Sequence, residues 1–317
     1  MTIIISKKEI ESIVQNLDVI AAMEKGFIDY SNGKTVVPPV GELVFEKEKG
    51  DAHIKYGYIK DDDFFVIKVA TGFYDNPKIG LSSSQGMMLV FSQKTGQSVA
   101  VLLDDGMLTD IRTAAAGALA AKYFAPKKVK GIGIIGTGIQ AKLQLEYLKN
   151  IVDCNSVWVW GRNKENVENF KNAMSDDFKI NIATTASEVA ENCNLIITTT
   201  PAEAALLLSK DIQPGTHITA VGSDTHKKQE LESAILQKAD LVIADSIPQS
   251  KSRGEIFRAV QEGVISENKI VEFGTAIQDP DLQRKNDEQI SIVDLTGVAV
   301  QDIMIAVAVY LNHKNSL

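Results

Sequence analysis

The sequence has few cysteines and no long apolar run, and both absences narrow the class of protein. Only two of its 317 residues are cysteines, Cys154 and Cys193, which is too few for a disulfide framework and typical of a reducing compartment. No stretch approaches the roughly 18 apolar residues that a membrane-spanning helix requires. The opening MTIIISKKEIE has too short an apolar part for a secretion signal and no cleavage site. We therefore expect a cytoplasmic protein that does not contact a membrane.

Positive charge is also in short supply. The chain has 33 Lys and Arg residues against 41 Asp and Glu residues, which gives a formal net charge of −8. A nucleic acid or an anionic membrane would require a basic face, so this balance argues against both partners. It still permits an anionic small substrate, because a few local cations are enough to bind one.

The motifs of several enzyme classes are missing as well. The four histidines, His53, His217, His226 and His313, lack the spacing of metal ligands, and there is no Cys-x-x-Cys pair. We therefore expect no metal site. A Gly-x-Ser-x-Gly elbow and a Walker loop are also absent, which argues against acyl transfer and nucleoside triphosphate hydrolysis.

What is present is the composition of a folded protein with more than one domain. Hydrophobic residues make up 44% and charged residues 23%, as in ordinary soluble domains, and 317 residues favour about two of them. Apolar residues at helical spacing over 7–31 predict a helix. Four runs rich in Val, Ile, Phe and Tyr within 52–103 predict an antiparallel meander. The N-terminal region is therefore mixed α+β.

In the rest of the chain, predicted strands alternate with predicted helices. An Ala-rich helix should start at Thr109 or Asp110 and end before Pro126. The alternation continues to a last strand over 288–297, and a helix over 299–313 with an apolar stripe closes the chain. This pattern predicts βαβ units and a parallel sheet, hence an α/β fold.

The strongest local signal is a glycine-rich turn, Gly136-Thr-Gly138-Ile-Gln-Ala141, which matches the G-x-G-x-x-A pattern. It ends the apolar strand 131–136 and directly precedes a predicted helix. Its glycines would allow a tight turn and the close approach of a pyrophosphate, and the helix N-terminus would supply N–H groups and partial positive charge. This context predicts a dinucleotide site. The alternative is a glycine-rich turn without a ligand.

The end of the next strand, Trp160-Gly161-Arg162-Asn163-Lys164, bears on the choice of cofactor. A site that prefers NAD usually has an acidic residue here for the ribose 2′-hydroxyl. This sequence has Arg162 with Lys164 nearby, and a guanidinium suits a 2′-phosphate. We therefore predict NADPH as the cofactor, with NADH tolerated. The alternative is a solvated arginine at the end of a strand.

Three charged residues stand out as candidates for a substrate site. Arg112 lies in the first turn of the Ala-rich helix, where a cation is unfavourable because the helix dipole is positive there. Its presence is explained if Arg112 and the N–H groups of the helix N-terminus bind the same anion. The alternative is an ion pair with Asp105 or Asp110. Lys68 interrupts an apolar strand, where a lysine is costly unless it is paired, so it could be a functional cation; the alternative is an outward lysine on an amphipathic or edge strand. Asp224 ends a strand where ligands of open α/β sheets bind; the alternative is a cap for the following segment.

Four segments together resemble the ornithine cyclodeaminase/mu-crystallin family. They are KTGQSVAVLLDDGMLTDIRTAAAGALAAKYFA (94–125), GIIGTGIQA (133–141), AVGSDTHKKQEL (220–231) and DLTGVAVQD (294–302). The resemblance covers nearly the whole chain in order, and it is nearest to the Δ1-pyrroline-2-carboxylate (ketimine) reductases.

The resemblance implies a fold, an activity and an assembly. The implied fold is a Rossmann-type parallel-sheet domain over 119–298 and a mixed α+β substrate-binding and dimerisation domain over 1–118, closed by the C-terminal helix 299–317. The implied reaction is NAD(P)H-dependent reduction of a cyclic imino acid, foremost Δ1-pyrroline-2-carboxylate to L-proline and also Δ1-piperideine-2-carboxylate to pipecolate. The implied assembly is a homodimer.

Site residues follow from their positions in the family's motifs. Lys68 matches a lysine near the substrate carboxylate, Arg112 an arginine that touches carboxylate and cofactor, and Asp224 a proposed acid/base, so Lys68 and Asp224 are the catalytic candidates. The predicted substrate-binding residues are Lys55, Lys68, Arg112, Thr296 and Gly297. With the glycine-rich turn included, the predicted cofactor-binding residues are Ser84, Arg112, Thr113, Gly136, Gly138, Ile139, Gln140, Ala141, Arg162, Asn163, Lys164, Thr200, Val221, Gly222, Ser223, Asp224, Lys228 and Thr296.

Two departures from the family pattern bear on the substrate. Val40 follows Pro38-Pro39 where many members carry an arginine, and Lys55 stands where the cyclodeaminases place a glutamate. A lysine there would repel the distal ammonium of a diamino acid. We therefore prefer an imine reductase. Ornithine cyclodeaminase and an NADPH-regulated small-ligand-binding protein are the alternatives.

Overall fold

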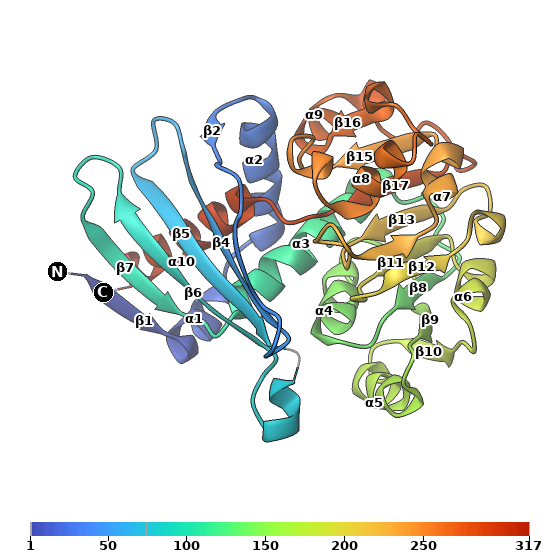
Figure 1. The fold of residues 1–317 in the computed structure, drawn as a ribbon, viewed down its shortest axis with the longest axis horizontal. Helices are drawn as coiled ribbons and strands as arrows, with labels where there is room; N and C mark the ends of the chain where they lie inside the picture. The colour runs from blue at the N-terminus through green and yellow to red at the C-terminus, as the bar shows by residue number, and fades with distance from the viewer. Residues whose placement is uncertain (1, 74, 317) are drawn as a thin grey trace. The chain divides into compact units, whose positions relative to one another are not determined.

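Each half of the predicted architecture has its own sheet in the structure (Figure 1). The computed structural model describes residues 2–73 and 75–316; residues 1, 74 and 317, which belong to the predicted first domain, lie outside the described residues. By its contacts the chain divides into two units, Met1–Arg112 with Val298–Leu317, and Thr113–Gly297. The first division falls inside helix α3 (Met107–Phe124).

The described part of the first unit contains a seven-stranded sheet in the order β1-β7-β6-β5-β4-β2, with β3 also paired to β4. Its strands are β1 (Ile3–Ser6), β2 (Thr35–Val36), β3 (Gly41–Phe45), β4 (Gly50–Ile59), β5 (Phe64–Phe73), β6 (Ser84–Ser92) and β7 (Ser98–Leu103). Strands β4 to β7 form antiparallel pairs in chain order, which confirms the predicted meander. β1 adds to β7 in parallel.

The helices of the first unit are α1 (Lys7–Val14), α2 (Val19–Ser31) and α10 (Ala299–Asn315), with a 3-10 turn at Asn76–Ile79 and the start of α3. The single helix predicted over 7–31 is wrong. The side chain of Asp18 accepts the backbone N–H of Ala21 at 3.0 Å and so begins a second helix. α10 packs against α2 and along β4, β5 and β6, so elements of its own unit cover its apolar stripe (Figure 1).

The two faces of this sheet differ in their cover. Lys55, Lys68 and Met88 are paired in register and buried on the face that carries α10. The residues next to them along each strand point to the other face, because side chains alternate in a strand. That face is apolar as well, yet Tyr56, Met87 and Leu103 are 39%, 41% and 40% exposed. An apolar surface of this kind is typical of an interaction site.

The described part of the second unit contains an eight-stranded sheet in the order β10-β9-β8-β11-β13-β17-β15-β16, and every pair in it is parallel. The strands are β8 (Ile132–Ile135), β9 (Ser156–Trp160), β10 (Lys179–Ile182), β11 (Leu195–Thr198), β13 (His217–Ala220), β15 (Leu241–Ala244), β16 (Ile270–Glu272) and β17 (Ser291–Asp294). The predicted parallel sheet, and with it the α/β class, is confirmed. The strand order changes direction between β8 and β11, which is where such folds bind their ligands.

Helices connect these strands, as the alternating pattern predicts. They are the rest of α3, α4 (Ile139–Leu148), α5 (Lys164–Met174), α6 (Ala186–Asn192), α7 (Ser233–Lys238), α8 (Gly254–Gln261) and α9 (Phe273–Gln278), with short 3-10 turns at Ser209–Asp211, Gln249–Lys251, Glu267–Lys269 and Pro280–Leu282. A small pair, β12 (Glu203–Leu207) with β14 (Gln229–Leu231), lies outside the main sheet.

The start of α3 differs from the prediction. We expected the helix to begin at Thr109 or Asp110, but it begins at Met107. The buried carboxylate of Asp104 accepts the backbone N–H of Leu108 at 2.8 Å and thereby serves the first turn. Asp104, Asp105 and Asp110 lie close together in the sequence, and local spacing does not show that Asp104 is the buried one.

Candidate functional site

Gly136 and Gly138 of the glycine-rich turn occupy their positions for different physical reasons. Gly136 follows β8 with a φ of 121°, and a Cβ there would lie 2.4 Å from Oγ1 of Thr199, so the protein itself requires glycine. Gly138, at the N-terminus of α4, has an ordinary φ of −79°, and a Cβ there would meet nothing within 4 Å. Protein packing therefore does not explain Gly138. A glycine at this position would leave room for a ligand that approaches the N–H groups of α4.

A pocket of about 390 Å³ surrounds this loop at the carboxyl ends of β8, β9 and β11. It lies between β8 and β11, where the strand order changes direction and where open parallel sheets bind nucleotides. It brings together five of the predicted cofactor residues, Gly136, Gly138, Arg162, Asn163 and Thr200. Its full lining is Gly136, Thr137, Gly138, Trp160, Gly161, Arg162, Asn163, Asn166, Thr199, Thr200, Pro201, Ala202 and Leu206.

The other residues of the loop divide into exposed and buried positions. Arg162 is exposed, and among the described residues it has no hydrogen-bond or ion-pair partner. Asn163 caps α5 by accepting the N–H of Asn166 at 3.2 Å, and Lys164 begins that helix. Ile139 is 53% exposed, whereas Ala141 is fully buried. The small side chain of Ala141 lets α4 pack closely, which is the usual task of the last position of the pattern.

A buried charge cluster lies in the first unit. Nζ of Lys68 on β5 lies 2.9 Å from each carboxylate oxygen of Asp302 on α10. Nε of Arg112 on α3 donates to the same carboxylate at 3.0 Å, and its Nη1 donates to Oε1 of Gln301 at 3.2 Å. All three charged side chains are 5% exposed or less. Lys55 lies opposite Lys68 in the strand register and is buried too.

These contacts decide two alternatives. Lys68 is not an outward lysine of an edge strand, because β5 lies between β4 and β6 and Lys68 is only 2% exposed. Arg112 forms an ion pair with Asp302, whereas Oδ2 of Asp105 lies 3.5 Å from Nζ of Lys7. Both predicted cations therefore meet at one carboxylate that the sequence reasoning missed.

Burial sets the protonation of the cluster. It lowers the pKa of Lys68 to about 7, with help from Arg112 and Lys55 and against the attraction of Asp302. Burial alone would raise the pKa of Asp302, but Lys68, Arg112 and Lys55 hold that pKa below its usual value. Burial also raises the pKa of the nearby Asp104 carboxyl. At neutral pH the cluster can therefore hold or release one proton at Nζ of Lys68.

A signal for Asp302 was present in the sequence. Asp302 interrupts the apolar closing helix, just as Lys68 interrupts an apolar strand, and a buried charge of either sign requires a partner. The same reasoning applied to the helix would have paired the two. Nη2 of Arg112 donates to none of the described residues, so the guanidinium retains a donor for a ligand.

Other predicted residues lie outside both groups. Asp224 follows β13 and forms an ion pair with Lys228 at 2.7 Å. It does not cap a helix, because the segment after it becomes strand β14. In the second unit, the hydroxyl of Thr296 donates to the buried Asp245 at 2.8 Å, and the N–H of Gly297 donates to the same carboxylate at 2.7 Å.

The remaining predicted positions are spread over both units. Ser84 begins β6 and is exposed, and Val221 and Ser223 are buried on either side of Gly222 after β13. The amide of Gln144 on α4 donates to the backbone O of Thr113 and to the side chain of Gln140.

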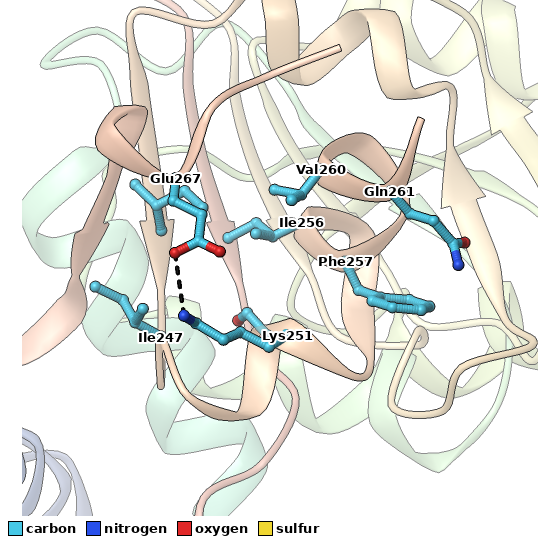
Figure 2. Close-up of a pocket in the computed structure, with 9 residues that line it drawn as sticks. Ile247, Lys251, Ile256, Phe257, Val260, Gln261 and Glu267 are labelled. Carbon is cyan, nitrogen blue, oxygen red and sulfur yellow. Dashed lines mark hydrogen bonds and ion pairs between the residues drawn. The ribbon is translucent and has the colours of Figure 1, made fainter. Parts of the chain in front are cut away.

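A second hollow of the second unit contains none of the predicted residues (Figure 2). It has a volume of about 260 Å³ and lies beside α8. Ile256, Phe257 and Val260 make it largely apolar, and Lys251 and Glu267 form an ion pair of 3.0 Å across one side. Its lining cation, Lys251, is already paired with Glu267.

Residues 2–73 and 75–316 contain neither a metal-binding cluster nor a membrane-spanning helix. No group of three His, Cys, Asp or Glu side chains there is arranged to hold a metal ion. None of the helices in the same residues combines the length and apolarity needed to cross a bilayer.

Comparison with known proteins defines the class of protein to which this chain belongs. The chain belongs to the ornithine cyclodeaminase/mu-crystallin family, whose profile matches residues 1–316. This confirms the resemblance drawn from the four sequence segments.

Individual relatives are similar over nearly their whole length. The chain is 36% identical to an uncharacterised cyclodeaminase of Sinorhizobium fredii, over 96% of this chain and 93% of that one. An archaeal alanine dehydrogenase dimer with bound NAD has 34% identity and a TM-score of 0.90, over 99% and 97% of the two chains. The Δ1-pyrroline-2-carboxylate reductase of Thermococcus litoralis in complex with NADH and L-proline has 28% identity and a TM-score of 0.92, over 99% and 98%. These relatives support an oxidoreductase.

The buried cluster makes a direct prediction for stability. Replacement of Asp302 by alanine leaves Lys68 and Arg112 buried without their shared counter-charge, so we expect a loss of about 3–5 kcal/mol in the free energy of unfolding. Urea unfolding measures this. The control is Asp281→Ala, which removes an exposed ion pair with Lys285 of 2.6 Å and should change stability little. Equal losses in the two variants would contradict the assigned role of Asp302.

Proposed function

We propose that this protein is an NAD(P)H-dependent reductase of a cyclic imino acid. The first candidate substrate is Δ1-pyrroline-2-carboxylate, which gives L-proline, and the second is Δ1-piperideine-2-carboxylate, which gives pipecolate. The observation that carries this proposal is the cluster of Lys68, Arg112 and Asp302. Two buried cations touch one carboxylate, and a buried positive excess is costly unless an anion joins it.

The residues of the cluster suit the carboxylate of an imino acid. Arg112 presents a planar fork of donors that matches a carboxylate, and its Nη2 remains available among the described residues. Lys68 supplies a second charge and, with a pKa lowered by burial to about 7, can deliver a proton from Nζ to the imine nitrogen. Protonation of that nitrogen makes the adjacent carbon more electrophilic. Asp224, which follows β13, is the alternative proton donor.

The second unit contains the residues that fit a dinucleotide. The open space at Gly138 and the N–H groups of α4 would hold the pyrophosphate, and Arg162 would face a 2′-phosphate. A reduced nicotinamide nucleotide supplies a hydride when it is bound. The NADH and L-proline complex of the Thermococcus litoralis reductase supports this pairing of cofactor and product class.

Lys55 favours the reductase over the cyclodeaminase alternative. Its charge acts on both Lys68 and Asp302, so it belongs to the same electrostatic environment. A diamino acid would bring a distal ammonium into a region that already holds several cations, and like charges repel. A cyclic imino acid brings only its carboxylate.

The substrate can be tested directly. Purified protein with NADPH or NADH should consume the reduced nucleotide when Δ1-pyrroline-2-carboxylate is added, as measured by absorbance. Arg112→Ala should lower kcat/KM about a hundredfold, because a charge-assisted contact to the substrate is lost. Arg258→Ala is the matched control, since within the described part of the chain Arg258 donates only to the backbone O of Lys227.

Other results would redirect the proposal. Ammonia release from ornithine with NAD⁺, without turnover of either imine, would establish the cyclodeaminase alternative. Binding of a nucleotide without any turnover would favour a ligand-binding protein.

The cofactor preference depends on Arg162. Arg162→Ala removes the cation that we assign to the 2′-phosphate, so the Kd for NADPH should rise about tenfold or more while the Kd for NADH stays the same. Titration of nicotinamide fluorescence measures both constants. Lys171→Ala, in the last turn of the same helix α5 and outside the pocket lining, serves as the control. An equal loss of affinity for the two nucleotides would refute the assignment.

The exposed apolar face of the first sheet favours a homodimer. A second copy of this chain would cover Tyr56, Met87 and Leu103, and the alanine dehydrogenase relative is a dimer. Met87→Glu should therefore convert the protein to monomers in sedimentation velocity, because the dimer would bury an unpaired charge. Ile79→Glu, at a residue that is 73% exposed in a 3-10 turn outside the sheet, should leave the dimer intact. A dimeric Met87→Glu variant would locate the interface elsewhere.

A further inference from the structure

A buried carboxylate joins two strand ends beside the nucleotide pocket. Glu230 on β14 has no exposed surface. Its Oε1 accepts hydrogen bonds from the backbone N of Thr200 at 2.6 Å and from the hydroxyl of Thr200 at 2.8 Å. Its Oε2 accepts the backbone N–H of Gly222 at 2.9 Å. Thr200 follows β11 and Gly222 follows β13, so one side chain ties together the ends of two neighbouring strands.

The two segments that Glu230 holds are in close contact. A Cβ at Gly222 would lie 2.2 Å from the backbone O of Thr200 and 2.5 Å from Oε2 of Glu230. Thr200 and its neighbours Thr199 and Pro201 form part of the wall of the nucleotide pocket. The position of that wall therefore depends on the carboxylate behind it.

We propose that Glu230 is a positioning residue for nucleotide binding, and that its ionised form is the one that keeps the pocket in shape. The inference rests on the proposed function, because it concerns the same nucleotide. An ionised carboxylate offers acceptors only, as the donors of Thr200 and Gly222 require. A protonated carboxyl carries an O–H group, which is a donor and cannot accept from one of those N–H groups. That hydrogen bond would be lost, and one strand end would be released.

The groups that face Glu230 come from three elements. The hydroxyls of Thr198 and Thr200 approach from the end of β11, and Gly222 approaches from the end of β13. From α8, Oε1 of Glu255 accepts the backbone N–H of Glu230 itself at 2.7 Å.

Glu255 and its neighbour complete a group of buried carboxyls. Asp294 on β17 is buried too, and burial, together with the charge of Glu255, raises its pKa. Burial raises the pKa of Glu230 to about 7, against the hydrogen bonds from Thr200 and Gly222. Burial, together with the charge of Glu230, raises the pKa of Glu255 to about 8. Glu230 should therefore take up a proton as the pH falls below about 7, and nucleotide affinity should fall with it.

The test measures the Kd of NADH from about pH 6 to about pH 8 in the full chain. NADH is the probe because it lacks the 2′-phosphate, whose second ionisation falls in this range. Glu230→Gln keeps the shape but turns a donor toward Thr200 or Gly222. Glu232→Gln is the matched control, since Glu232 also accepts a backbone N–H, that of Ser209 at 2.6 Å, away from the pocket.

We expect the unmodified chain and Glu232→Gln to lose roughly tenfold in affinity between the upper and lower pH. Glu230→Gln should bind roughly tenfold more weakly at the upper pH and show no pH dependence. A purely structural role would weaken binding without removing the pH dependence.

Several results would overturn this assignment. They are normal affinity in Glu230→Gln, or a pH dependence that persists in it. If that variant does not fold, constant affinity of the unmodified chain across the range decides against Glu230. If neither the unmodified chain nor Glu232→Gln binds NADH or NADPH, the proposed function itself fails and this inference falls with it.

Discussion

The first unit depends on one carboxylate, that of Asp302. It contacts Lys68 and Arg112, which lie 234 and 190 residues away in the chain, and it comes from the last helix. Without it, two cations would be buried among apolar side chains with no counter-charge, at a cost of several kcal/mol. α10 therefore does two things at once. It covers one face of the sheet, and it carries the charge that lets a strand lysine and a helix arginine stay inside.

Local pattern predicted much of this protein, and each failure has its own physical cause. The meander, the parallel sheet and the turn at Gly136 and Gly138 follow from spacing within short segments. Asp302 interrupts the apolar pattern of the closing helix, but its partners lie far away in the sequence. Glu230 binds backbone N–H groups, which no sequence pattern marks. The division of 7–31 into two helices depends on which of several polar residues caps, and Asp18 does. Lys68 and Arg112 could be identified because each is out of place in its own element.

The second unit uses acidic residues as internal acceptors for backbone N–H groups. Asp245 accepts from Gly297, Asp294 from Ile256, and Glu255 from Glu230 and Leu231. Each of these bonds gives an acceptor to a backbone N–H that would otherwise be buried without one, and together they hold Gly297 after β17, the first turn of α8 and strand β14 in place. The segments that follow the strands are where open parallel sheets bind ligands. Some of the chain's acidic residues thus shape the ligand-binding end of the sheet.

The two proposed sites place opposite demands on pH. Lys68 carries its charge below about pH 7, because burial lowers its pKa to about that value. Glu230 carries its charge above about pH 7, because burial raises its pKa to about the same value. A cation to hold the substrate and a carboxylate to hold the pocket wall coexist in the free protein only near neutrality. A bound carboxylate would stabilise the charged form of Lys68 and raise its pKa, so the substrate itself would extend this range on the alkaline side. Burial disfavours the charged forms of both Lys68 and Glu230, and the proposed reaction should therefore be favoured near neutral pH.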